Sequence, residues 1–93
     1  MSWSFLTNHA HVVLILAANP DTTLREVARL VGITERAAHR IVSELESEGA
    51  LRRFRVGRQN HYEVCTEFPL RHSLEEHCSL AQLIEMVSSR GDD

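Results

Sequence analysis

Apolar positions recur at helical spacing in four stretches of the chain. The first stretch follows a cap at Thr7 or Asn8 and runs to about Ala18. It is apolar on nearly every side across residues 12–16, which predicts a helix at the centre of the core. Asn19-Pro20-Asp21 then indicates a turn.

A second and a third helix follow closely. Thr23 with Glu26 forms a capping box ahead of a helix over Leu24–Val31, and Gly32 can take the positive φ that ends it. Thr34 caps a longer helix that runs to Gly49. The small Ala28 predicts a close approach of these two helices. The apolar stripe of the third helix is Ala38, Ile41, Val42 and Leu45.

Period-two alternation replaces helical spacing after the third helix. Two strands, Leu51–Val56 and His61–Val64, flank Gly57-Arg58-Gln59-Asn60, which predicts a hairpin with a four-residue loop. We expect two faces on this hairpin: an apolar one with Phe54, Val56, Tyr62 and Val64, and a polar one with Arg53, Arg55, His61 and Glu63.

The C-terminal extension, residues 65–93, has little periodicity before Ser79, and Pro69 makes part of it extended. Ser79 with Gln82 caps a last helix over residues 80–88, and residues 88–93 are expected to fray. An isolated apolar stripe on a small chain favours a homodimer seam. Its candidate residues are Leu80, Leu83, Ile84 and Val87, with Trp3, Phe5 and Leu6 as candidates to join them.

Composition adds a constraint on the partner. Ninety-three residues make one small domain, and a net charge of −3 disfavours nucleic acid. The distribution reverses that, because residues 51–62 hold four arginines and no acid, whereas residues 63–93 hold seven acids and two arginines. The basic charge is therefore local, as a DNA-binding face requires.

Cysteines and leader signals point to an ordinary cytoplasmic protein. Cys65 and Cys78 have no CxxC spacing, so we expect reduced thiols. The apolar run Val12–Ala18 is too short to cross a bilayer, and no Lys or Arg precedes Arg25, so a signal peptide is not expected. Gly-rich phosphate loops and nucleophile elbows are absent from the sequence, so we do not expect an enzyme or a cofactor.

Three helices followed by a basic hairpin resemble a winged helix–turn–helix. The turn at residues 31–34, the ending Leu45-Glu46-Ser47-Glu48-Gly49 and the basic wing Arg52–His61 are similar to small bacterial and archaeal regulators of the MarR/ArsR kind. The resemblance covers about residues 8–64. It implies a mainly α fold with a three-helix core, a two-stranded wing and here an additional C-terminal helix. The chain is shorter than typical MarR proteins.

That resemblance implies sequence-specific binding of double-stranded DNA by a homodimeric prokaryotic transcriptional regulator. The third helix would read bases in the major groove, and the wing would grip the flanking backbone or minor groove. The predicted DNA-binding residues are Thr34, Arg36, Ala37, His39, Arg40, Ser43, Arg53, Arg55 and Arg58.

Two other interpretations stay open. The same fold can serve protein–protein contact without DNA, which the negative net charge favours and the local basic wing disfavours. A metal-responsive regulator of the ArsR kind is the other, because Cys65, His72, His77 and Cys78 are potential ligands. Their spacing does not form a known ligand set, and we expect no metal. The operator, the sensed signal and any small-molecule effector are not encoded in these patterns.

Overall fold

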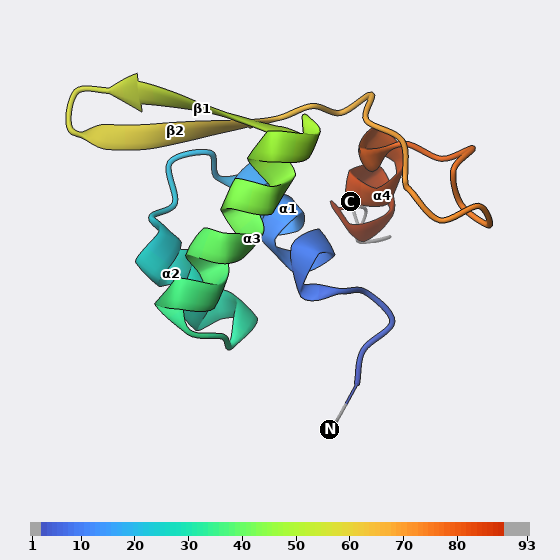
Figure 1. Ribbon diagram of the computed structural model, residues 1–93, viewed down its shortest axis with the longest axis horizontal. Helices are drawn as coiled ribbons and strands as arrows, with labels where there is room; N and C mark the ends of the chain where they lie inside the picture. The colour runs from blue at the N-terminus through green and yellow to red at the C-terminus, as the bar shows by residue number, and fades with distance from the viewer. Residues whose placement is uncertain (1–2, 89–93) are drawn as a thin grey trace.

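Helices precede and follow a β-hairpin in this chain (Figure 1). The structure is a computed structural model that describes residues 3–88. None of the helices in this range is long and apolar enough to cross a membrane. The elements are α1 (Asn8–Ala18), α2 (Leu24–Val31), α3 (Glu35–Glu48), β1 (Leu51–Val56), β2 (Gln59–Val64) and α4 (Leu80–Ser88).

Threonine caps begin the first three helices as predicted. The side-chain oxygens of Thr7, Thr23 and Thr34 each accept a hydrogen bond from the backbone N–H three residues on, at 3.0–3.2 Å. Only half of the capping box at α2 forms, because the Glu26 carboxylate accepts from Arg29 instead. Gly32 ends α2 with a φ of 88°, the left-handed conformation that its lack of a Cβ permits.

The main core lies where α1, α2, α3 and the hairpin meet. Val12 and Leu16 of α1 are fully buried, which confirms the central position predicted for this helix. Ala28 is 4% exposed and Ala38 is inaccessible, so small side chains line the contact of α2 with α3. The other members are Leu24, Val27, Ile41, Val42, Leu51 and Tyr62.

A second apolar cluster attaches the C-terminal extension to α1. Val13 and Ala50 are buried against Leu80, and Phe68 and Leu70 pack around them. The extension folds back on itself through a bridge between Pro69 and Ser79. Both clusters also contact Leu45 and Val64, so the extension continues the core of the domain. The predicted fraying concerned residues 88–93: Ser88 is the last residue of α4, and residues 89–93 lie outside the described range.

The hairpin differs from its prediction in loop length and in the sharing of its faces. Val56 pairs with Gln59, so the loop has two residues, Gly57 and Arg58. Gly57 has a φ of 62°, and a glycine with positive φ in the first loop position is typical of a tight type II′ hairpin. Gln59 and Asn60, predicted to be loop residues, belong to β2.

The prediction of which strand residues share a face was wrong. Residues directly opposite one another lie on the same face, and a hairpin loop of either two or four residues pairs even-numbered residues of β1 with odd-numbered residues of β2. Phe54 therefore shares a face with His61, and Arg53 shares one with Tyr62. The inner face carries Leu51, Arg53, Arg55, Asn60, Tyr62 and Val64; the outer face carries Arg52, Phe54, Val56, Gln59, His61 and Glu63.

The free edge of β2 is held by the turn between α1 and α2. The Tyr62 N–H donates to the Pro20 carbonyl at 2.9 Å, and the His61 ring bonds the Asp21 carboxylate at 2.8 Å. The base of the hairpin is thereby fixed to the helical body. Its tip extends well beyond α2 and α3 (Figure 1).

Candidate nucleic-acid interface

The N-terminal half of α3 presents a polar face to solvent. Arg36, His39, Arg40 and Ser43 are all exposed, and their spacing places them along one side of the helix. The opposite side is buried through Ala38, Ile41 and Val42. Because the core holds that side, the exposed side can enter a groove without unfolding any packing.

Three carboxylates of α3 lie near this face and reduce its positive charge. His39 lies 3.8 Å from Glu35, and the Arg40 guanidinium lies 3.5 Å from Glu44, one turn on. The pairing of Arg40 with Glu44 is the intrahelical contact that would compete with a base. The third carboxylate, Glu46, is engaged with the wing. Arg36 makes no ion pair within residues 3–88.

The wing carries its arginines on both faces. Arg53 bonds Glu46 of α3 at 3.1 Å, and Arg52 bonds Glu63 across the strands at the same distance. Arg55 donates to the Gly57 carbonyl at 3.4 Å, and Arg58 occupies the exposed second position of the loop. In the described part of the chain, Arg55 and Arg58 are the wing arginines without a carboxylate partner.

The acids in the C-terminal half of α3 each bind a different part of the molecule. Glu44 accepts from His9 of α1 at 2.7 Å, Glu46 contacts Arg53 of β1, and Glu48 contacts Arg71 of the extension at 3.1 Å. The hydrogen bond with His9 and the charge of Arg40 hold the pKa of Glu44 below its usual range. These contacts link α3 to α1, to β1 and to the extension.

The predicted dimer residues divide between core and surface. Leu80 is 7% exposed and belongs to the second cluster, and Leu83 and Ile84 are half-buried against it. Val87 is 45% exposed. The neighbouring Met86, which is 63% exposed, was not among the predicted dimer residues. Its position in the apolar C-terminal part of the last helix was the sequence signal that could have identified it.

The N-terminal segment adds further exposed apolar surface. Trp3 and Phe5 are both exposed and stack edge to face, with ring centroids 5.0 Å apart. Leu6 is half-buried and lines the neighbouring pocket.

The candidate metal ligands do not converge. Cys65 and Cys78 are free and half-buried, and the His72 ring accepts from the backbone N–H of Leu74 at 3.0 Å. Among residues 3–88 no group of three or more His, Cys, Asp or Glu side chains could hold a metal ion.

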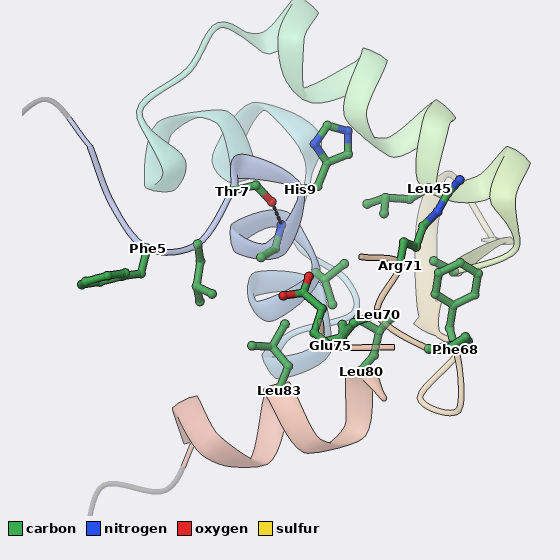
Figure 2. Close-up of a pocket in the computed structure, with 15 residues that line it drawn as sticks. Phe5, Thr7, His9, Leu45, Phe68, Leu70, Arg71, Glu75, Leu80 and Leu83 are labelled. Carbon is green, nitrogen blue, oxygen red and sulfur yellow. Dashed lines mark hydrogen bonds between the residues drawn. The ribbon is translucent and has the colours of Figure 1, made fainter. Parts of the chain in front are cut away.

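An open pocket of about 270 Å³ lies between the N-terminal segment, α1 and the extension (Figure 2). Its lining is mainly apolar and includes Val13, Leu70 and Leu83. His9 and Arg71 contribute polar groups on the side toward α3. Sequence reasoning did not identify His9, because its partner Glu44 is 35 residues away and no local pattern links them.

Comparison with known proteins identifies the same module. Residues 8–52 match the family model described as winged helix-turn-helix DNA-binding. The chain is 29% identical over 66 residues to an uncharacterized protein of Methanocaldococcus jannaschii, MJ1254, and this match covers 70% of the chain but only 14% of that protein. The chain therefore spans about one seventh of the length of this curated relative.

Two solved structures share the fold. One is the PcaV transcriptional regulator of Streptomyces coelicolor, solved with its natural ligand, with a TM-score of 0.56 and 20% identity over 94% of this chain and 65% of that chain. The other is Lactococcus lactis ZitR, a zinc-responsive MarR family member, with a TM-score of 0.54 and 14% identity over 99% of this chain and 69% of that chain. The chain has the winged helix–turn–helix fold and shares it with these two regulators, which confirms the fold class expected from the sequence.

Proposed function

We propose that this chain is a homodimeric transcriptional regulator that binds double-stranded DNA in a sequence-specific manner. The observation that carries the proposal is the exposed row Arg36, His39, Arg40 and Ser43 on α3, next to a projecting wing in which two arginines have no carboxylate partner among residues 3–88. The match of residues 8–52 to a DNA-binding family supports it. So does the MarR-like fold.

Base recognition is assigned to the N-terminal half of α3. An α-helix fits the major groove, and an arginine there can donate two hydrogen bonds to O6 and N7 of guanine. Arg36 and Arg40 have the reach and the exposure for this contact. The other α3 residues assigned to the interface are Thr34, Ala37, His39 and Ser43.

Backbone or minor-groove contact is assigned to the wing. Arg55 and Arg58 are free to engage phosphate, and Arg53 shares the inner face with Arg55. Arginine contacts to phosphate release condensed counterions, so affinity should depend steeply on salt. The wing would thus position the protein on the duplex, and α3 would read the bases.

Homodimerisation is assigned to exposed apolar side chains at the two ends of the described chain. Val87 and Met86 lie on the outer side of α4, and Trp3 and Phe5 lie in the N-terminal segment. Leu83 and Ile84 contribute their remaining exposed surface, whereas Leu80 supports the seam from the core. A two-fold dimer would present two copies of α3 to successive half-sites.

Selection of bound duplexes from a random pool, followed by titration of the selected sequence and a scrambled one, tests the proposal. We expect Arg40→Ala to lower affinity for the selected duplex by roughly five- to 150-fold, equivalent to about 1–3 kcal/mol, and affinity for the scrambled duplex much less. No binding of the unmutated chain to any duplex at low salt would overturn the proposal.

One observation favours a second candidate, a winged helix that binds protein and not DNA. The outer wing face exposes Phe54 and Val56, which are 46% and 61% exposed. Arg52 on that face is already paired with Glu63. Under this candidate, Phe54→Ser would abolish partner capture and leave any duplex binding unchanged.

A further inference from the structure

Glu44 connects the candidate DNA-reading face with α1. One carboxylate oxygen accepts from His9 Nε2 at 2.7 Å, and the other lies 3.5 Å from Arg40 Nη1. Two basic groups from different elements therefore share one carboxylate. One of them, Arg40, is exposed on the face assigned to base recognition.

We propose that Glu44 is a positioning residue that holds Arg40 away from DNA, and that protonation of His9 draws Glu44 toward α1 and releases Arg40. The inference rests on the proposed function. It assigns to this chain a DNA affinity that increases under mildly acidic conditions through one identified histidine.

The direction follows from charge. Histidine side chains change charge between about pH 5 and pH 8, whereas the carboxylate stays ionised through that range because its pKa is held low. Neutral His9 offers Glu44 only a hydrogen bond, so among the described residues Arg40 is the only cation paired with that carboxylate. Protonated His9 neutralises Glu44 directly, which weakens the hold on Arg40. DNA that engages Arg40 favours the protonated form in return.

The other charged groups around His9 belong to α3 and the extension. Glu48 and Arg71 border the same hollow beside His9 and are paired with each other, so their charges largely cancel. Glu75, a further carboxylate, lines the pocket of Figure 2 together with His9. The segment at residues 3–7 brings no charged side chain to His9.

The main experiment measures duplex affinity at about pH 8 and about pH 5.5 for the unmutated chain and His9→Gln, with the selected duplex as probe. We expect the unmutated chain to gain roughly two- to fivefold more affinity on acidification than His9→Gln, the size of one exposed ion pair. His39 sits on the DNA face and gives both proteins the same background gain. His11→Gln is the matched control, since His11 lies on the same helix, its ring bonds Asn8, and it has no ion pair with any carboxylate among residues 3–88.

A double-mutant cycle tests whether His9 acts on Arg40 through Glu44. Glu44→Gln should bind more tightly at about pH 8, and adding His9→Gln to it should leave the pH response unchanged. Glu48→Gln makes the same charge change one turn further along α3 and should have the smaller effect. A pH response that survives His9→Gln in full, or equal effects of Glu44→Gln and Glu48→Gln, would overturn the inference while leaving DNA binding intact.

A measurement without DNA makes the inference testable even if the proposed function fails. The Arg40 Nε–Hε resonance of the free protein should shift with the titration of His9, and this shift should vanish in Glu44→Gln. A resonance that does not change with pH would overturn the inference whatever the duplex titrations show.

Discussion

Arg53 of β1 bonds Glu46 of α3 with 3.1 Å between Nη2 and Oε1, and this ion pair joins the wing to α3. The Glu46 side chain is only 23% exposed, so this pair is better shielded from water than Arg52 with Glu63. The pair keeps one inner-face arginine close to the body of the domain. Breaking this ion pair by removing the charge of Glu46 should therefore change both the position of Arg53 and the net charge around the wing.

We expect Glu46→Gln to free Arg53 for phosphate and to raise affinity for non-specific duplex, at a stability cost of about 0.2–1 kcal/mol. Glu63→Gln is the matched control, because it makes the same charge change and frees Arg52 on the outer face. Duplex titrations and thermal melts check both variants. Equal gains would show that only net charge matters.

The contact between α2 and α3 depends on a small side chain at Ala28. Ala28 is 4% exposed and faces a helix whose own Ala38 is fully buried, so added methylenes have no space. We expect Ala28→Leu to cost about 1–3 kcal/mol in the free energy of unfolding. Ala18→Leu, at the exposed end of α1, is the control and should cost little. An unchanged melting temperature for Ala28→Leu would contradict this packing.

Tyr62 is 1% exposed, and its buried hydroxyl has no hydrogen-bond partner among the described residues. A buried polar group without a partner costs about 1–3 kcal/mol. We therefore expect Tyr62→Phe to leave stability unchanged or to raise it, measured by chemical denaturation. A loss of stability would mean that the hydroxyl has a partner in solution.

Arg58 occupies the second loop position at the tip of the wing, where it adds nothing to the core. We expect Arg58→Ala to reduce the slope of log affinity against log salt by about one unit per bound subunit, with thermal stability nearly unchanged. Arg71→Ala removes the same charge from the extension, at the other side of the molecule, and should leave the slope intact (Figure 1). Identical slopes for Arg58→Ala and the unmutated chain would show that the wing tip does not contact DNA.

The proposed dimer seam can be tested at residues that the monomer does not bury. Met86→Glu combined with Val87→Glu should yield monomers in light scattering and weaken duplex binding, because a dimer contributes two copies of α3. Leu83 and Ile84 are poorer choices, since charges there would also disturb the second cluster. A stable monomer for the unmutated chain would refute the seam.

The sequence alone determined those helices and strands whose signals lie within a few neighbouring residues. The first three helices begin at threonines, and α2 and α3 end at glycines, because caps satisfy backbone groups within a few residues. The apolar stripe of α3 likewise predicted which side would be buried, and hence which arginines would be exposed. The basic hairpin was predicted in place, because strand alternation and the glycine turn are also local.

Tertiary structure decided what depends on residues far apart in the chain. Strand pairing set the two-residue loop in place of the expected four-residue one, because alternation along each strand leaves the register between the strands open. Packing against Val13 drew Leu80 into the core of the monomer. Folding also brought His9 to Glu44, since a contact between elements 35 residues apart exists only once the helices have packed.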